Sequence, residues 1–186
     1  MTSVALSNID KDIFASTGTD GMFHVWNFGH GNPVSSSFVN GGVAVNGVCT
    51  SFTTPHMCST VSQDGYCRLW DSRQMDKGCV QIAILNQIGT AVSWSSTAES
   101  RCIAGLADGR VCVVDWRMNG MISDQKLHSA RVNHLRVGND ASGFGGDNFY
   151  VTSSDDCSSI VFSESPPVAA DVFLPGVQQE ELRYIS

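Results

Sequence analysis

The sequence predicts an all-β protein built from four repeats of four strands each. Asp-Gly pairs recur at a spacing of 44 residues, short apolar runs flank each pair, and no convincing helix precedes the last few residues. The pairs are Asp20-Gly21, Asp64-Gly65 and Asp108-Gly109, and a less regular fourth unit centres on Asp156-Cys157, 48 residues further on. We expect the extra length of the fourth unit in an enlarged loop over the glycine-rich stretch Gly138–Asn148.

Residues at fixed distances from each aspartate agree in type. The position six before the aspartate is apolar or aromatic: Phe14, Cys58, Cys102 and Tyr150. The position four before it is small: Ser16, Thr60, Ala104 and Thr152. The position six after it is large and apolar: Trp26, Trp70, Val114 and Phe162. This agreement over several columns makes the repeat the strongest signal in the chain.

Each unit contains a hairpin centred on its aspartate, clearest at Ile13–Thr17 and Met22–Trp26. Asp-Gly favours a two-residue hairpin turn, since both central residues can need a positive φ, which glycine adopts without strain and aspartate tolerates. Two further apolar runs complete each unit, and in the second unit these are Val45–Thr50 and Val80–Leu85. A four-stranded unit of this length is typical of one blade of a β-propeller.

The units resemble WD40 repeats over about residues 3–173. The matching residues are Phe14 to Gly21 leading to Val25-Trp26-Asn27, and Met57 to Asp71 closing on Arg68-Leu69-Trp70-Asp71. The third unit ends Val113-Val114-Asp115-Trp116, so its tryptophan is displaced by two places, and the fourth has Phe162-Ser163. The resemblance implies four blades, at about residues 1–40, 41–86, 87–127 and 128–174, and a C-terminal tail at 175–186. The tail includes Gln178–Ser186, which has a polar composition compatible with a helix.

In WD40 repeats a hydrogen-bonded set of His, Ser or Thr, Asp and Trp ties the strands of a blade together. The resemblance implies turn carboxylates at Asp20, Asp64, Asp108 and Asp156, and indole donors at Trp26 and Trp70. The Gly-His opening of the repeat is missing almost everywhere, and Leu127-His128 is its one substitute, before the fourth blade. We interpret the aspartates as architectural rather than catalytic, because one aspartate per repeat at one column is what repeat architecture produces.

Composition excludes several function classes. The net charge of −7 disfavours a nucleic-acid groove or a polybasic membrane patch, because both need an excess of cations. No apolar run is long enough to span a membrane. The seven cysteines include no CxxC pair, so no disulfide framework, zinc site or other metal site is expected. No nucleophile, phosphate or dinucleotide motif occurs. We expect an intracellular protein, nuclear or cytoplasmic, with no cofactor, no catalytic residues and other proteins as partners.

The segment Trp70-Asp71-Ser72-Arg73 resembles the WDxR motif by which some WD-repeat proteins dock onto the adaptor of cullin-4 ubiquitin ligases. On this interpretation Trp70, Asp71 and Arg73 form a docking site, with Arg73 as a forked donor to a partner carboxylate. The alternative is that Arg73 caps its own turn or lies in solvent. Arg117 occupies the same column in the third unit, which favours this architectural alternative.

Two narrower resemblances compete. The small WD-repeat nucleoporin of the Y-shaped outer-ring complex of the nuclear pore is suggested by Trp70 to Gln74, Gln81-Ile82, Thr54-Pro55, Asp115-Trp116-Arg117 and Met121. The WD-repeat subunit of the arginine-methyltransferase methylosome is suggested by Trp70 to Arg73, Gly89 to Trp94, Val113-Val114-Asp115, His128-Ser129 and Asp156-Cys157-Ser158. Both imply a non-catalytic scaffold, and short blade-to-blade links, which match the nucleoporin in two successive units, favour it.

Four blades are fewer than a WD-type ring usually takes, which is about seven, or roughly 300 residues. An arc of four blades leaves strand edges and apolar faces open at its two ends. We expect a segment of a larger propeller, with two alternatives: ends covered by another chain or copy, or closure as a small ring. The sequence leaves the oligomeric state open.

Overall fold

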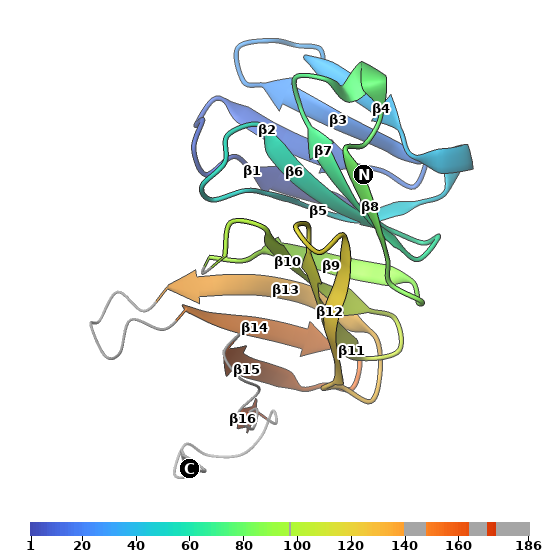
Figure 1. Ribbon diagram of the computed structural model, residues 1–186, viewed down its shortest axis with the longest axis vertical. Coiled ribbons are helices and arrows are strands. Elements are labelled where there is room, and N and C mark those ends of the chain that lie inside the picture. Colours follow the sequence, from blue (N-terminus) through green and yellow to red (C-terminus); the bar gives the residue numbers. More distant parts are fainter. Residues whose placement is uncertain (97, 140–147, 164–170, 174–186) are drawn as a thin grey trace.

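The computed structural model of the chain describes residues 1–96, 98–139, 148–163 and 171–173. The sixteen strands in these residues form four sheets (Figure 1). The first two sheets contain β1 (Ser3–Leu6), β2 (Ile13–Thr17), β3 (Met22–Asn27) and β4 (Ser35–Phe38), then β5 (Val45–Thr50), β6 (Met57–Ser62), β7 (Tyr66–Asp71) and β8 (Gln81–Ile84). The other two contain β9 (Gly89–Trp94), β10 (Arg101–Leu106), β11 (Arg110–Asp115) and β12 (Gly120–Lys126), then β13 (Val132–Asn139), β14 (Asn148–Ser154), β15 (Ser159–Ser163) and β16 (Asp171–Phe173).

Each sheet is an antiparallel meander in which strands pair in chain order. The predicted fold class, all-β with four four-stranded units, is confirmed. The helical segments among the described residues are two 3₁₀ turns, η1 (Asn40–Gly42) and η2 (Met75–Lys77). No helix in these ranges is long and apolar enough to span a membrane. The expected tail at 175–186 and most of the expected loop at 138–148 lie outside the described residues.

The four sheets stack face to face, with the first strands β1, β5, β9 and β13 next to one another along the centre (Figure 1). Successive side chains of a strand point to opposite faces of its sheet, and the two middle sheets carry apolar side chains on both faces. Trp70 packs against Phe23 of the first sheet, with ring centroids 5.4 Å apart. Behind it, the second and third sheets enclose a core that includes Leu69 and Trp94. The arrangement is that of successive propeller blades, and we number the blades 1 to 4.

The hairpin turns differ from the predicted two-residue form. Of each Asp-Gly pair only the glycine has a positive φ, at 77°, 80° and 89° for Gly21, Gly65 and Gly109. The turn is four residues long, because the glycine N–H donates to the carbonyl three residues back, as Gly65 does to Ser62 at 3.2 Å. A turn of this kind followed by one left-handed residue is another common hairpin solution, and it leaves the aspartate in ordinary backbone geometry.

The fourth turn has Cys157 in the glycine position, at a φ of 65°. A left-handed conformation costs a residue with a Cβ atom roughly 1 kcal/mol relative to glycine. We therefore expect Cys157→Gly to raise the free energy of unfolding by about 0.5–1 kcal/mol, measured by urea denaturation. The matched change Gly65→Cys should lower it, and a destabilised Cys157→Gly protein would contradict the turn geometry.

Buried cysteines fill part of the cores between blades. Five thiols are buried, whereas Cys79 is half-buried and Cys157 is exposed. Burial raises the pKa of Cys58 and of Cys112 to about 12. Because the thiolate is the reactive form, buried thiols should be protected both by access and by protonation.

We expect a disulfide-exchange reagent at pH 8 to modify Cys157 of the native protein within minutes and Cys79 more slowly. The five buried thiols should react only after unfolding in guanidinium. Mass spectrometry of the modified protein identifies the sites. Fast native modification of a third cysteine would contradict the packing between blades.

Candidate functional site

All four turn aspartates act on the backbone in the same way. Each accepts a hydrogen bond from the N–H two residues further along, at 3.1 Å for Asp20, 3.2 Å for Asp64 and Asp108, and 3.0 Å for Asp156. Such side-chain turns explain why aspartate recurs in this column. Beyond this shared bond, the four blades give their aspartates different partners.

Blades 2, 3 and 4 are each preceded by a residue that makes the same backbone hydrogen bond. The backbone N–H groups of Val39, Leu85 and His128 each donate to the carbonyl of the turn glycine in the preceding blade, at 2.8, 2.8 and 3.0 Å. All three side chains are buried. The column that carries histidine before blade 4 therefore carries apolar residues before blades 2 and 3. Sequence reasoning found His128 but missed Val39 and Leu85, because aliphatic residues do not stand out.

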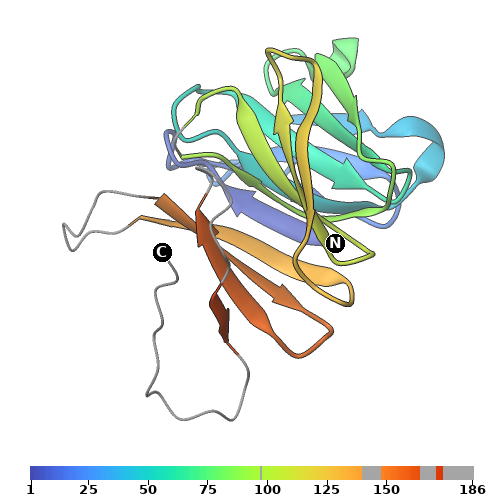
Figure 2. The same cartoon turned by 60° about the horizontal axis from the view of Figure 1, so that its bottom comes forward.

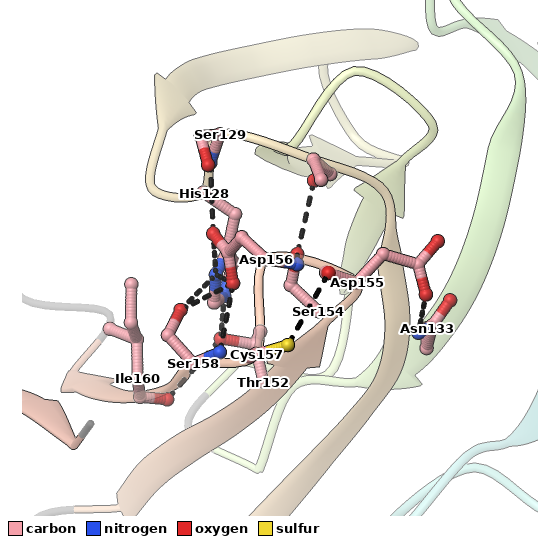
Figure 3. Close-up of polar contacts among 11 residues, drawn as sticks. His128, Ser129, Asn133, Thr152, Ser154, Asp155, Asp156, Cys157, Ser158 and Ile160 are labelled. Atoms are coloured by element: carbon pink, nitrogen blue, oxygen red, sulfur yellow. Dashed lines mark hydrogen bonds and ion pairs between the residues drawn. The ribbon is translucent and has the colours of Figure 1, made fainter. Parts of the chain in front are cut away.

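Blade 4 contains a complete network around His128 (Figure 3). Its Nδ1 lies 3.1 Å from Asp156 Oδ2, and its Nε2 lies 2.9 Å from Thr152 Oγ1. The Ser158 hydroxyl donates to Asp156 at 2.6 Å, and the Ser129 N–H donates at 2.9 Å. Next to the carboxylate, Nδ1 is the donor, and the Thr152 hydroxyl beside Nε2 also donates to the Ile160 carbonyl at 3.3 Å.

Hydrogen bonding controls the charge of Asp156. Burial alone raises the pKa of this carboxyl group, but hydrogen bonds from Ser158, the Ser129 N–H and His128 outweigh it and hold the pKa well below its usual range. Carboxylate, imidazole and hydroxyl lie in the order of a nucleophilic triad. However, His128 is 2% exposed and Thr152 is 0% exposed, so no substrate reaches the hydroxyl. The network ties the loop before β13 to β14 and β15.

In blade 2 the side chain that bonds the turn aspartate is an arginine. Arg68 on β7 is 2% exposed, and its guanidinium donates to both carboxylate oxygens of Asp64, at 2.6 and 3.1 Å. It also donates to the Ser62 hydroxyl at 2.7 Å. Burial raises the pKa of Asp64, but the hydrogen bonds from Arg68 and Ser62 more than offset this and lower it. A cation between the apolar residues Cys67 and Leu69 of β7 was the signal that sequence reasoning missed.

The predicted indole donors lie on β3 and β7. Trp26 Nε1 donates to Ser16 Oγ and Trp70 Nε1 donates to Thr60 Oγ1, both at 2.8 Å. Blade 4 has no equivalent bond because Phe162 carries no N–H. Its ring instead stacks on Tyr150, with centroids 5.5 Å apart.

Blades 1 and 3 lack the extended network. Asp20 is exposed and serves its own turn. In blade 3 the hydroxyl column is occupied by Ala104, and the displaced Trp116 donates from Nε1 to Cys102 Sγ at 3.3 Å. Asp108 pairs with Arg110 at 3.1 Å on the surface.

The predicted docking segment begins at the end of β7. Trp70 is buried, whereas the Arg73 side chain is 61% exposed. The Arg73 guanidinium forms a two-pronged ion pair with Asp71, at 3.0 and 2.7 Å, and the Arg73 N–H adds a third bond at 3.0 Å. This hydrogen bonding lowers the pKa of Asp71. The pair fixes the direction in which Arg73 leaves the turn.

The same turn in blade 3 is built differently. The Arg117 N–H donates to Asp115 at 2.9 Å, as Arg73 does to Asp71. The Asp115 carboxylate, however, pairs with Arg101 of β10 at 3.0 Å. The backbone bond is thus shared repeat architecture, whereas of these two turns the one in blade 2 has the two-pronged side-chain pair and the one in blade 3 does not.

A second set of equivalent residues joins neighbouring first strands. Thr2, Asn46 and Thr90 are spaced by 44 residues. Thr2 donates to the carbonyl of Val45, Asn46 donates to that of Gly89 at 2.8 Å, and Thr90 donates to that of Val132 at 2.5 Å. We call these bonds the inner ladder. The column was missed in the sequence because it mixes threonine and asparagine.

Among the described residues, no group of three or more His, Cys, Asp or Glu side chains is placed to hold a metal ion. The chain is similar to the peroxisomal targeting signal 2 receptor of Schizosaccharomyces pombe, with 28% identity over 97 residues. The match covers 52% of this chain and 31% of the receptor, so it spans about a third of that relative's length. No protein-family model matches the chain. Similarity to a WD-repeat protein and the stacked four-stranded sheets together fit a WD40-type propeller segment.

Proposed function

We propose that the chain is a non-catalytic scaffold that binds other proteins within a multisubunit complex. The observation that supports this proposal is that the polar clusters are buried and bonded inside the blades. His128, Thr152 and Arg68 are buried and bonded within single blades, so they stabilise the blades and leave turns and strand edges to make contacts. Rigid rings that present loops are suited to binding. Similarity to a WD-repeat receptor supports a protein-interaction role.

We further propose that this complex is the outer ring of the nuclear pore, with the chain at the nuclear envelope. Several residues that suggested this assignment are exposed, among them Pro55, Arg73, Gln74 and Arg117. Packing within the fold does not determine the identity of exposed turn residues. A resemblance among them is therefore better evidence for a shared partner than a resemblance among core residues.

The methylosome is the alternative. Gly89 to Trp94, which suggested it, is strand β9, and each of its residues is buried. His128 and Asp156 to Ser158 contribute to the network within blade 4. Packing and bonding within the blades account for these residues without a partner. We therefore rank the methylosome second.

Docking onto a cullin-4 adaptor is a further alternative, carried by the exposure of Arg73. Its Nε and one terminal nitrogen are paired with Asp71, and the structure gives the other terminal nitrogen no partner. A partner carboxylate could accept from that side of the fork. The name of the similar receptor adds a fourth candidate, binding of a targeting peptide.

One experiment separates these assignments. The tagged full chain, expressed in cells of its own source, should concentrate at the nuclear rim and co-purify with outer-ring nucleoporins. Recovery of an arginine methyltransferase instead would favour the methylosome. Recovery of the cullin-4 adaptor, lost in Arg73→Ala, would favour a ligase receptor, and recovery of peroxisomal matrix proteins would favour a peptide receptor. An enzymatic activity that survives removal of every partner would contradict the scaffold proposal itself.

A further inference from the structure

Three asparagines of the chain are followed directly by glycine: Asn40, Asn46 and Asn119. This dipeptide is chemically labile, because the backbone nitrogen of the second residue attacks the side-chain amide carbon of the asparagine, and glycine has no Cβ atom to hinder the approach. In a folded protein the reaction also requires an accessible, unbonded amide and a backbone that is able to move. The Asn40 side chain lies outside the described residues, so the structure distinguishes between the other two.

Asn119 is the last residue of the turn between β11 and β12, and this yellow turn projects from the end of its sheet in Figure 2. Its side chain is exposed, and the structure gives its amide group no hydrogen bond within the described part of the chain. A Cβ atom at Gly120 would meet only the Met118 carbonyl oxygen, at 4.0 Å, so the space around the attacking nitrogen is open. Asn119 has a φ of 52°, a left-handed conformation that is unfavourable for a residue with a Cβ atom and is therefore readily given up.

Two other asparagines each lack one of these features. Asn46 is also followed by glycine, but its Nδ2 donates to the Gly89 carbonyl at 2.8 Å, and a Cβ atom at Gly47 would lie 3.4 Å from Ala91 Cα. Its amide is bonded and its backbone is held between two blades. Asn86 is exposed like Asn119 and has a similar φ of 59°, but the next residue is a glutamine, whose side chain hinders the attack. Of these three asparagines, Asn119 alone combines exposure, a free amide and a following glycine.

We propose that Asn119 deamidates spontaneously in the folded protein. The Gly120 nitrogen gives up its proton to hydroxide and forms a bond to Asn119 Cγ, and the side-chain nitrogen leaves as ammonia. Water then adds to either carbonyl of the resulting five-membered succinimide and opens it to aspartate or isoaspartate. The net reaction consumes one water and releases one ammonia.

The modification changes the charge and the backbone of the blade 3 turn. This turn exposes Arg117, Met118 and Asn119, and within its described part the structure gives the Arg117 side chain no ion pair. Deamidation adds a carboxylate two residues after Arg117 and so cancels the net charge of the exposed turn. In the isoaspartate form the backbone gains one carbon atom where Asp115 pairs with Gly120, which disturbs the end of the ladder between β11 and β12.

The chemistry does not depend on the proposed scaffold function, but it acts on a surface which that function uses. Arg117 is among the exposed residues that support the proposed partner. The surface offered to that partner therefore changes with the age of the protein.

The test incubates the purified full chain at pH 8 and 37 °C and samples it over several days. Trypsin releases the peptide 118–126, in which Asn119 is the sole asparagine, and mass spectrometry detects deamidation as a gain of about 1 Da. In the native protein we expect Asn119 to react about tenfold faster than Asn46 or Asn86, or more. In guanidinium Asn46 should reach the rate of Asn119, because both are then unfolded Asn-Gly pairs, whereas Asn86 should stay slow.

Gly120→Ala isolates the attack by the backbone nitrogen. The site has room for a methyl group and its φ is not positive, so the variant should fold, and the reaction of Asn119 should slow by about tenfold. Gly31→Ala is the matched control, since nothing lies within 4 Å of a Cβ atom there and no asparagine precedes it, and it should leave the rate unchanged. Thermal unfolding shows that each variant is folded.

The proposal is overturned if native Asn119 reacts no faster than Asn86, or if Gly120→Ala does not slow it. A native Asn46 that reacts as fast as Asn119 would also overturn it, because the fold would then not select the site. The comparison of Asn46 with Asn119 needs no variant, so it remains decisive even if Gly120→Ala does not fold. None of these outcomes affects co-purification with a complex, so this proposal and the proposed function fail separately.

Discussion

Replacing Arg68 with methionine is expected to lower the free energy of unfolding by about 3 kcal/mol. The guanidinium is 2% exposed and bonds Asp64 and Ser62, and methionine fills most of its volume without a donor. Removing one member of a buried ion pair leaves the other charge uncompensated, which typically costs about 3–5 kcal/mol. The Asp64 side chain keeps 16% exposure, so the lower end of that range applies. Urea denaturation with an unchanged m-value measures the loss.

Arg110→Met is the matched control, because Arg110 pairs with two aspartates but is 46% exposed. Its change in stability should be small beside that of Arg68→Met. Adding Asp64→Asn to Arg68→Met should restore part of the loss, since the amide needs no counterion and can still accept the Tyr66 N–H. If the double variant were no more stable than Arg68→Met, the buried charge would not be the cause.

The fold could be predicted because its signal is periodic. Asp-Gly pairs 44 residues apart mark one turn per blade, and the alternation of apolar residues around them marks the strands. The turn type was wrong, because a two-residue turn and a four-residue turn with one left-handed glycine share the same dipeptide. At Cys157 the left-handed position is kept without glycine, which composition alone does not reveal.

The polar clusters were less predictable because equivalent positions hold unlike residues. Val39, Leu85 and His128 share one backbone bond, but their side chains have no chemistry in common. Arg68 does for Asp64 what His128 does for Asp156, yet the two come from different elements, a central strand and a loop. A search for the same residue type at a fixed spacing cannot detect a partner of the turn aspartate that comes from a different position of the repeat in each blade.

Blade 3 has lost the histidine and the hydroxyl together. It combines Leu85 in the histidine column with Ala104 in the hydroxyl column, so no buried hydroxyl is left without a partner. Blade 4 combines His128 with Thr152. The two blades are alternative consistent solutions. Blade 2 keeps the buried Thr60 hydroxyl beside an apolar Val39 because Trp70 Nε1 donates to it, and Phe162 of blade 4 carries no such N–H, so the mixture should be destabilising in blade 4.

His128→Leu creates that mixture in blade 4, and we expect it to lower the free energy of unfolding by about 2–4 kcal/mol. Leucine matches Leu85 in shape, but it leaves the Thr152 hydroxyl without its ring partner and removes a donor from Asp156. The buried Thr152 hydroxyl then keeps only its long bond to the Ile160 carbonyl, at 3.3 Å, and the loss of a partner of a buried polar group costs about 1–3 kcal/mol. Urea denaturation measures the loss, and the apparent melting temperature should fall by roughly 5–15 °C.

Two further measurements identify the cause. Adding Thr152→Ala reproduces the pair Leu85 and Ala104 of blade 3, so the double variant should recover about 1 kcal/mol. Because the pKa of Asp156 is lowered in the folded state, its ionised form contributes stability above the unfolded value of about 3.9. That contribution disappears as the pH falls through the folded pKa, so the deficit of Asp156→Asn should shrink below pH ~4. A deficit that stays constant with pH, together with no recovery by Thr152→Ala, would show that packing of the imidazole ring, rather than its hydrogen bonds, holds blade 4 together.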